Sequence, residues 1–400
     1  MPAPAPSAPR APEAWDLRWA PVTAYLDHAA TTPLRPEAAA AMLPLLSDRF
    51  GNPSGVHSVA RAARQALDEA REAVAAALGA SPGEVVFTAS GTEADNLAVL
   101  GAHALGGGTA VCSAIEHHAV LHSCRAVGVR VAPVTAEGIV DLEGLAALLD
   151  RAEQDGRDVS VVSVMLANNE VGTVQPLGAV ADLVRARAPR TVVHTDAVQA
   201  FAWMDVSAAA ACADLVSVSA HKFGGPKGVG ALVVREGVAL APVIHGGGQE
   251  RDRRSGTHNV AGIVGMAAAM TATVASREET VVRVTRLRDR LADGLLAAVP
   301  GAVESGIRAA KVAGSCHLRF PGVESEALLV LLDEAGVCAS AGSACASGAL
   351  EASHVLKAMG VPEDEALASL RLSLGWTSTD DDVELALKAV PEAVARLRGG

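Results

Sequence analysis

Residues 214–230 read DLVSVSAHKFGGPKGVG, an apolar run followed by a lysine and a glycine-rich turn. The first five residues predict a short buried strand, and the glycines after it predict a tight turn, so Lys222 lies at a strand end. A charged lysine is seldom buried without a partner. Lys222 is therefore either a solvated loop residue or a desolvated amine that binds an aldehyde covalently, with Ser219 and His221 as donors to a nearby anion. The stretch alone leaves both interpretations open.

Strand patterns and helical patterns alternate along the chain on both sides of this stretch. The residues between most of these strands repeat apolar positions at helical spacing, which is typical of a parallel sheet covered by helices. We therefore predict an α/β fold with a doubly wound, mostly parallel, seven-stranded sheet and a smaller α+β domain. The expected strands are residues 85–88, 110–113, 127–133, 159–165, 191–194, 215–218 and 231–234.

Composition excludes several classes of protein. Half of the 400 residues are hydrophobic, 20% are charged, 2% are aromatic and the net charge is −12, which argues against a direct nucleic-acid surface or a base-stacking site. The six cysteines form no CxxC pair, which indicates reduced thiols and a cytoplasmic location. The longest apolar run, residues 260–275, is shorter than the roughly 18 residues that span a bilayer, so we expect a buried helix and no membrane contact.

Changes in composition divide the chain into three parts. Residues 1–22 are rich in proline and alanine and predict a disordered leader. Residues 23–260 contain the strand and helix alternation and predict a large domain. Residues 261–400 begin with a long helical region and continue with short strands and helices, which predict a small C-terminal α+β domain.

Polar residues follow several of the expected strands. The segments are ASGTEADN after residue 88, AIEHHAV after residue 113, ANNEVG after residue 165 and TDAVQ after residue 194. Carboxyl ends of parallel strands meet at one edge of a sheet, so these segments should gather around one crevice. The small-residue turn at Thr92 suits a phosphate resting on backbone N–H groups. Taken singly, His117 is more often a helix-start residue, and Asn169 or Asp196 a turn or cap residue.

Cys345 lies in a stretch of small residues, CASAGSACASGALEASHVL, between residues 337 and 356. This composition predicts an exposed, flexible loop rather than a packed strand. A structural cysteine is usually buried and inert, whereas a loop thiol is accessible and can serve as a nucleophile. The sequence thus marks Cys345 as a candidate nucleophile.

Together these motifs resemble the class V aminotransferase group of fold-type I pyridoxal 5′-phosphate enzymes, and more narrowly the cysteine desulfurases with a long mobile cysteine loop. The resemblance covers the chain from Tyr25 to about Thr379. The motifs that carry it, in order, are YLDHAATTP, FGNPSGVH, FTASGTEADN, EHHAV, NNEVG, HTDAVQ, SAHKFGGPKG, HGGGQERDRRSGT, SAGSACASGALEASHVL and LRLSLG.

The resemblance implies roles for individual residues. Lys222 would hold the cofactor covalently and move the substrate Cα proton, Asp196 would keep the pyridine nitrogen protonated, and His117 would stack on the ring and move protons. Arg371 would clamp the substrate carboxylate, and Cys345 would take the sulfur of L-cysteine as a persulfide. Further implied contacts are Gly91, Thr92, Ser219 and His221 around the phosphate, Gln199 and Asn169 near the phenolic oxygen, Asn52 and His57 at the mouth, and Thr257 in the partner's phosphate site.

The same resemblance implies partners and leaves alternatives. It implies a homodimer and a sulfur-acceptor or iron–sulfur scaffold protein, with Cys345 as a transient iron–sulfur ligand. A selenocysteine lyase or another transaminase or lyase of this group is one alternative, and a non-catalytic sulfur-relay scaffold is another. No residue distinguishes iron–sulfur assembly from tRNA thiolation, a thio-cofactor pathway or DNA phosphorothioation as the destination of the sulfur.

Overall fold

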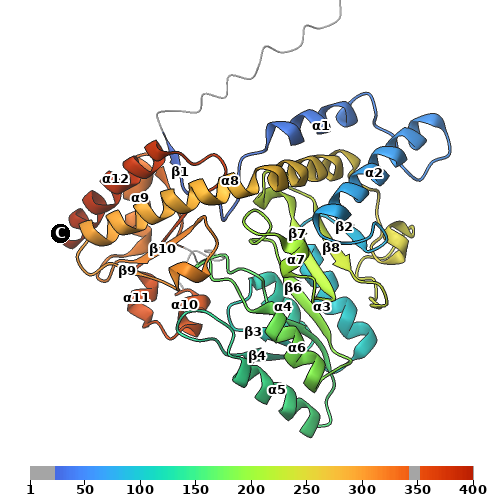
Figure 1. The fold of residues 1–400 in the computed structure, drawn as a ribbon, viewed down its shortest axis with the longest axis horizontal. Coiled ribbons are helices and arrows are strands. Elements are labelled where there is room, and N and C mark those ends of the chain that lie inside the picture. Colours follow the sequence, from blue (N-terminus) through green and yellow to red (C-terminus); the bar gives the residue numbers. More distant parts are fainter. Residues whose placement is uncertain (1–22, 342–351, 400) are drawn as a thin grey trace, which may run out of the picture.

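The computed structural model describes residues 23–341 and 352–399, and its centre is a seven-stranded sheet (Figure 1). The strand order is β2-β8-β7-β6-β5-β3-β4; β8 is antiparallel to both of its neighbours and the other pairings are parallel. The predicted mostly parallel α/β sheet is thus confirmed. The strands are β2 (Val85–Thr88), β3 (Thr109–Ser113), β4 (Val129–Ala132), β5 (Val159–Ser163), β6 (Val192–Asp196), β7 (Leu215–Ser219) and β8 (Gly230–Val234).

The central strands are apolar and buried along their length because helices cover the sheet, as expected for a parallel sheet. One strand starts later than the sequence pattern predicts. Val127 ends the preceding helix and Gly128 has φ 84°, a left-handed conformation, so regular pairing begins only at Val129. The helices of this unit are α3 (Gly91–Gly106), α4 (His118–Ala126), α5 (Leu142–Gln154), α6 (Leu177–Arg187) and α7 (Val206–Ala209).

A second unit has a core of its own around a three-stranded antiparallel sheet. It also contains the start of the described chain, because β1 (Ala24–Tyr25) pairs in parallel with β11 (Val337–Cys338) and Leu26 is buried in this second core. The other elements of this unit are β9 (Val303–Glu304), β10 (Ser315–Arg319), β12 (Ser369–Ser373), η3 (Arg308–Ala310), α9 (Ser325–Glu334), α10 (His354–Ala358), α11 (Glu363–Leu367) and α12 (Asp380–Gly399).

Helix α8 (Val260–Ala298) belongs to both units and runs along them in Figure 1. Its buried apolar residues from Ile263 to Met270 lie in the first core and those from Val284 onward lie in the second, so the boundary expected at residue 260 is the start of a shared helix. It is long and apolar enough to cross a membrane by length and composition, but half of that apolar window is buried inside the protein. The helices α1 (Pro36–Leu46) and α2 (Ser58–Ala77) pack against it.

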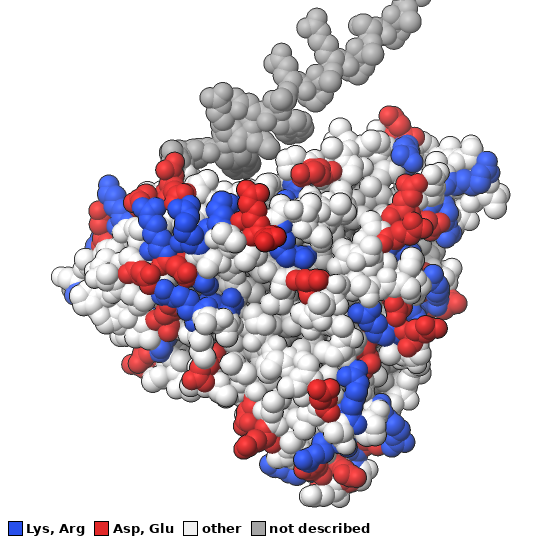
Figure 2. Space-filling view, viewed as in Figure 1, with Lys and Arg blue, Asp and Glu red and all other residues white. Residues whose placement is uncertain are grey.

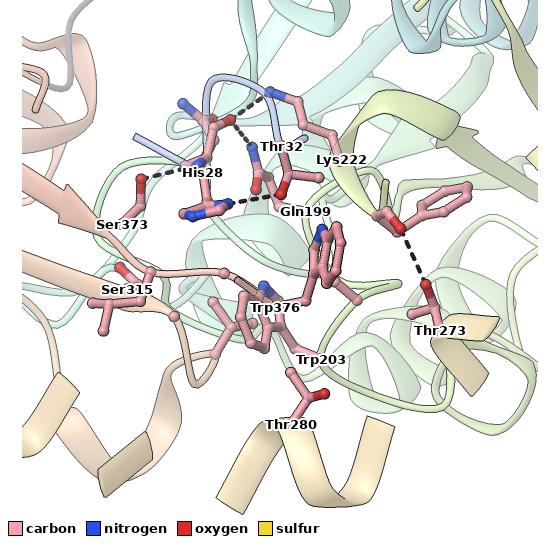
Figure 3. A pocket seen from close by; sticks show the side chains of 18 of the residues that line it. His28, Thr32, Gln199, Trp203, Lys222, Thr273, Thr280, Ser315, Ser373 and Trp376 are labelled. Carbon is pink, nitrogen blue, oxygen red and sulfur yellow. Dashed lines mark hydrogen bonds between the residues drawn. The ribbon is translucent and has the colours of Figure 1, made fainter. Parts of the chain in front are cut away.

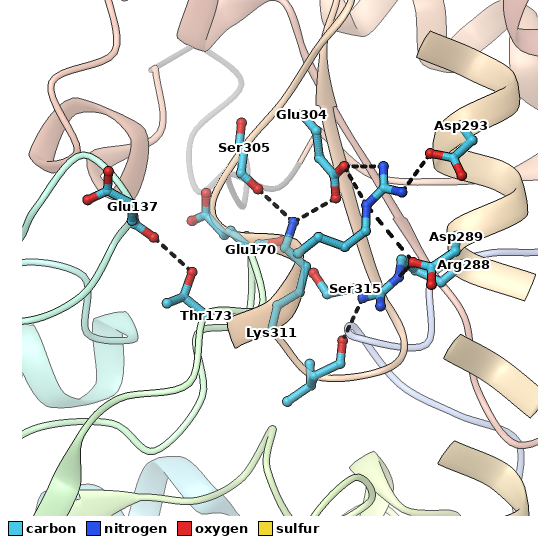
Figure 4. A network of polar contacts seen from close by, with 12 residues as sticks. Glu137, Glu170, Thr173, Arg288, Asp289, Asp293, Glu304, Ser305, Lys311 and Ser315 are labelled. Carbon is cyan, nitrogen blue, oxygen red and sulfur yellow. Dashed lines mark hydrogen bonds and ion pairs between the residues drawn. The ribbon is translucent and has the colours of Figure 1, made fainter. Parts of the chain in front are cut away.

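Charged side chains lie along the outer face of α8, and one buried ion pair lies in the second unit where it meets the first. Figure 2 shows acidic and basic side chains interspersed along α8 and α12, where Arg286 pairs with Asp380. Deeper in the protein, the fully buried amine of Lys311 donates to Glu304 Oε1 at 3.0 Å and to the Ser305 carbonyl at 2.7 Å (Figure 4). The backbone of Lys311 also bridges to the turn after β5, which fixes that turn to the second unit.

Candidate functional site

A cavity of about 400 Å³ lies at the carboxyl edge of the large sheet, where the predicted segments meet. This volume lies within the usual range of small-molecule and cofactor sites. Lys222 reaches it from the short helix η1 (Ala220–Lys222), directly after β7. The predicted residues that line it are Gly91, Thr92, His117, Asn169, Asp196, Gln199, Ser219, His221, Lys222 and Arg371.

The N-terminus of α3 forms one end of the cavity. The Ser90 hydroxyl accepts from Glu93 N at 3.1 Å and caps the helix, and the Glu93 carboxylate accepts from Ala89 N, one residue before the cap, at 2.9 Å. A Cβ at Gly91 would lie 2.8 Å from Val198 Cγ2, so a side chain would fill the space in front of the helix. Helix N-termini attract phosphates through backbone N–H groups and the helix dipole. This end therefore fits the phosphate of the cofactor, and the S-x-x-E spacing could have added Ser90 to the predicted set.

The amine of Lys222 faces the chain segment that precedes the sheet. Its Nζ donates to the Ala29 carbonyl at 2.5 Å and to the Ala30 carbonyl at 2.9 Å. Burial, followed by the positive charge of Arg371, lowers the pKa of Lys222 to about 8, although Asp196 and Asp27 oppose the shift. A larger share of the amine is therefore neutral near physiological pH, as covalent capture of an aldehyde requires.

Asp196 ends β6 and offers a carboxylate to the base of the cavity. Its Oδ1 accepts from Val198 N at 2.8 Å, and burial raises its pKa to about 6 despite that bond and the charge of Lys222. A cationic ring nitrogen nearby would lower this pKa again, because an opposite charge favours the ionised acid. Asp95, a lining residue that the sequence patterns did not single out, is almost fully buried beneath it, with Oδ1 3.6 Å from His194 Nε2.

His117 is the N-cap residue of α4, and this position decides where its proton lies. Its Nδ1 accepts from Ala119 N at 3.1 Å, so the neutral ring carries its proton on Nε2. Burial, followed by the charge of Lys222, lowers the pKa of His117 to about 4. In this state His117 is a neutral hydrogen-bond donor at the wall of the cavity.

Arg371 extends into the cavity from β12 of the second unit. Its Nη2 donates to Asp27 Oδ1 at 2.8 Å and its Nη1 donates to the Asn169 carbonyl at 3.1 Å. Its buried Nε has no hydrogen-bond partner within residues 23–341 and 352–399. Arg371 lines the cavity and each of its Nη groups carries a second N–H, so its guanidinium is suited to bind a carboxylate.

Four predicted residues are not placed in this cavity by the described chain. Asn52 and His57 are exposed on the loop before α2 and at its N-cap, and Thr257 is exposed on the glycine-rich and arginine-rich loop after the short helix η2 (Gln249–Asp252). These three are not among the lining residues that the structure describes. Cys345, the predicted nucleophile and transient iron–sulfur ligand, lies outside the described residues. In the described ranges no group of three or more His, Cys, Asp and Glu side chains is arranged to hold a metal ion.

Comparisons with known proteins agree with this site. The family model described as aminotransferase class-V matches residues 24–386. The chain is 43% identical to the cysteine desulfurase IscS of Methanosarcina thermophila, over 94% of this chain and 92% of that protein. It is 46% identical to an IscS-like cysteine desulfurase of Mycobacterium tuberculosis, over 94% and 97%.

The solved structures lead to the same family. A structure titled NifS-like protein superposes with a TM-score of 0.85 at 35% identity, and the match covers 94% of this chain and all of that one. The predicted fold class and the predicted cofactor are confirmed by these matches together with the sheet and its cavity. The chain belongs to the class-V aminotransferase family, in the pyridoxal 5′-phosphate-dependent cysteine desulfurase branch that its motifs predict.

Proposed function

We propose that this chain is a cysteine desulfurase that moves the sulfur of L-cysteine to Cys345 and releases L-alanine. The observation that carries the proposal is the meeting of Lys222, Asp196, His117 and Arg371 in one cavity, with a helix N-terminus at one end and a carboxylate-binding arginine at another. A sulfur-relay scaffold has no use for this arrangement, so an enzyme is the better explanation.

Each wall of the cavity would hold a different part of the cofactor. The first turn of α3 with Ser219 and His221 would hold the phosphate, His117 would lie on the ring, and Lys222 would bind the aldehyde carbon. Asp196 would pair with the ring nitrogen. Bound there, the cofactor supplies an electron sink for the electrons released when the substrate Cα proton leaves.

The side chains of the chain itself then carry the substrate through the reaction. Arg371 binds the substrate carboxylate, and Lys222 Nζ accepts the Cα proton. The thiolate of Cys345 attacks the substrate sulfur, so an S–S bond forms and the C–S bond breaks. The electron pair of the broken bond stays with the substrate Cβ. His117 takes up the proton that the Cys345 thiol loses and passes it to Cβ, and Lys222 returns its proton to Cα. One thiol and one cysteine thereby give one persulfide and one alanine, with no external oxidant or reductant.

The test of this proposal is to locate the sulfur after a single turnover. Mass spectrometry should find one added sulfur on the peptide that contains Cys345, and Cys345→Ser should bind cofactor and L-cysteine yet form no alanine. Cys338→Ser is the matched control, because Cys338 is half-buried in β11 and burial raises the pKa of its thiol. Sulfur on Cys338, or full activity in Cys345→Ser, would contradict the assignment.

We also propose that two copies of the chain complete each other's sites. Support comes from the exposed apolar side chains of Leu43, Leu46, Phe50 and Val56, which lie close in sequence to Asn52 and His57 and are called the apolar patch below. Exposed large apolar side chains that gather on a surface are typical of a protein interface. A dimer through this patch would explain why Asn52, His57 and Thr257 lie on the surface of a single chain.

Mixed dimers test which subunit supplies Thr257. The variants Lys222→Ala and Thr257→Ala should each have little or no activity alone. They are mixed so that hybrid dimers form. If Thr257 serves the partner's site, each hybrid contains one site with both native residues, and the mixture regains activity well above the mean of its parents. No gain, together with sedimentation of an active monomer, would exclude the proposed exchange.

For the destination of the persulfide we propose a sulfur-acceptor protein of the iron–sulfur assembly type. The support is the name IscS-like cysteine desulfurase of the Mycobacterium tuberculosis relative and the length over which the two chains match. Incubation of the persulfidated protein with an apo iron–sulfur scaffold, followed by sulfur mapping on the scaffold, tests this step. Persistence of the persulfide in the presence of the scaffold would argue for another acceptor.

A further inference from the structure

The segment Asp27–Thr31 of the motif YLDHAATTP has no role in the mechanism above, yet it passes between the two units beside the cavity. It is held on both sides. His28 N and Ala29 N donate to the carbonyl and the hydroxyl of Ser373 on β12, at 3.1 and 2.9 Å. Thr32 N donates to the His221 carbonyl at 3.1 Å beside Lys222. Because contacts from both units fix it, the segment has a defined place in the site.

This segment contacts both cationic groups of the site. Figure 3 shows Lys222 and Gln199 converging on one backbone oxygen of the segment, the Ala29 carbonyl, which accepts at 2.5 and 2.8 Å. At the other end, the Asp27 carboxylate pairs with Arg371 Nη2 at 2.8 Å, and the two side chains are only 22% and 7% exposed. A carboxylate–guanidinium pair in such an environment is stronger and more directional than a solvated one.

The pair leaves part of the guanidinium unused. Nη1 and Nη2 each use one N–H, on the Asn169 carbonyl and on Asp27, and each carries a second N–H; Nε is buried and has no acceptor in the part of the chain that the structure describes. The Tyr25 hydroxyl donates to the Asp27 carbonyl at 3.2 Å, and Asp27 bridges to Ser373, so the backbone that carries the carboxylate is fixed. Arg371 is thus oriented by two acceptors and has a second N–H on each Nη left for a further acceptor.

We propose that Asp27 is a positioning residue for substrate binding: it stays paired with Arg371 and holds the guanidinium at the cavity wall, so that the remaining N–H groups of Nη1 and Nη2 receive the substrate carboxylate. Asp27 does not touch the substrate in this arrangement. It acts by limiting the rotamers of Arg371, whose long side chain would otherwise lose entropy on binding. The inference rests on the proposed desulfurase function, since it assigns Arg371 the carboxylate of an α-amino acid.

If Asp27 instead competed with the substrate, the Asp27→Asn variant would behave differently. If Asp27 competed with the substrate for Arg371, removing its charge would strengthen binding, because a like charge beside the substrate carboxylate would disappear. The two roles therefore predict KM changes of opposite sign for Asp27→Asn, a substitution that keeps the size and shape of the side chain.

The experiment measures KM and kcat for Asp27→Asn in the holoenzyme. We expect KM for L-cysteine to rise about tenfold and kcat to stay within about twofold, since hydrogen bonds to charged groups contribute roughly that factor to binding. In an Arg371→Lys background, the added effect of Asp27→Asn should fall below about twofold, because the guanidinium that it positions is gone. Asp155→Asn is the matched control, since it breaks the exposed Arg130–Asp155 pair at 2.6 Å.

Two readouts independent of turnover complete the test. Affinity of the apoprotein for pyridoxal 5′-phosphate should change by less than about twofold in Asp27→Asn, because Asp27 is the weaker of the two carboxylates that raise the pKa of Lys222. Binding of L-alanine, followed by the absorption of the bound cofactor, should weaken in parallel with KM. A lower KM, or an equal effect of Asp27→Asn with and without Arg371, would overturn the proposal. Absence of desulfuration in the unaltered protein would instead count against the proposed function, while the L-alanine titration would still report on Asp27.

Discussion

The lowered pKa of Lys222 predicts how fast the apoprotein captures its cofactor at each pH. Only the neutral amine attacks an aldehyde, and burial followed by the charge of Arg371 brings the pKa of Lys222 from 10.5 to about 8. At pH 7 about a tenth of the amine is then neutral, against about one part in three thousand for an unperturbed lysine. The structure therefore predicts a gain of about 300-fold in reactive amine at pH 7.

The assay is the rate of covalent cofactor uptake by the apoprotein between pH 6 and 10.5, followed by absorption and trapped with borohydride. The rate, divided by that of a free lysine derivative under the same conditions, should show a midpoint near pH 8 for the protein. This division removes the titration of pyridoxal 5′-phosphate itself. Peptide mapping after reduction should place the link on Lys222, and Lys227→Arg serves as the control for the nearest other lysine.

Neighbouring charges should shift this midpoint in known directions. Because Arg371 lowers the pKa of Lys222 and Asp196 raises it, Arg371→Gln should move the midpoint to higher pH and Asp196→Asn should move it to lower pH. A midpoint above pH 10 in the unaltered protein would refute the argument from burial. Shifts of the wrong sign in both variants would refute the argument from charge.

Three further predictions concern binding and stability. Arg371→Lys should lower kcat/KM for L-cysteine by tens to hundreds of fold, about 2 kcal/mol, because a planar bidentate pair is lost; steady-state kinetics measure it. Lys311→Ala should lower the free energy of unfolding by about 3 kcal/mol and Lys311→Met by less, in denaturant titrations, since Lys311 forms a buried pair with Glu304. Glu250→Gln should cost about 3 kcal/mol at pH 7 and almost nothing near pH 2.

The pH dependence of the Glu250 contribution follows from the sign of its pKa shift. Burial opposes ionisation, but hydrogen bonds from His258 and Arg71 and the charge of Arg71 outweigh it and lower the pKa of Glu250 from 4.5 to about 2. A depressed carboxyl pKa stabilises the fold fully above the unfolded value and loses that stabilisation as the pH falls toward the folded value. The stabilisation should therefore disappear between about pH 4.5 and pH 2.

The sheet and the residues at its edge could be predicted from the sequence because both depend on local patterns. Lys222, Asp196 and His117 each follow an apolar run that had to be a buried strand, and parallel strands end at one edge. The predicted strand bounds were wrong only in detail. The strand expected from residue 127 begins at Val129, because Gly128 has a left-handed conformation that its apolar neighbours do not reveal.

Contacts between distant parts of the chain could not be predicted in this way. Strand β1 joins the second core by pairing with β11, more than 300 residues later, and two residues carry no periodicity that could indicate it. Asp95 was missed because a single acidic residue on a helix is normally solvated, and only the packing of α3 beneath the cavity makes it a buried group. In the proposed dimer, Asn52, His57 and Thr257 would complete the site of a second chain, and such a contact leaves no pattern in the sequence of one chain.

The position of Arg371 shows why these long-range contacts matter for chemistry. Lys222 is fixed by the large sheet, whereas Arg371 belongs to a strand of the second unit. The distance between the two groups that we assign to the cofactor and to the substrate carboxylate therefore depends on how the units are joined. Two sets of contacts fix that distance. The segment from Asp27 to Thr31 touches both groups directly, and the backbone of Lys311 holds the turn that carries Asn169, whose carbonyl orients Arg371. A change at either place should therefore weaken substrate binding before it disturbs the sheet. The sheet is stabilised by its own core, whereas the distance between Lys222 and Arg371 depends only on the contacts between the units.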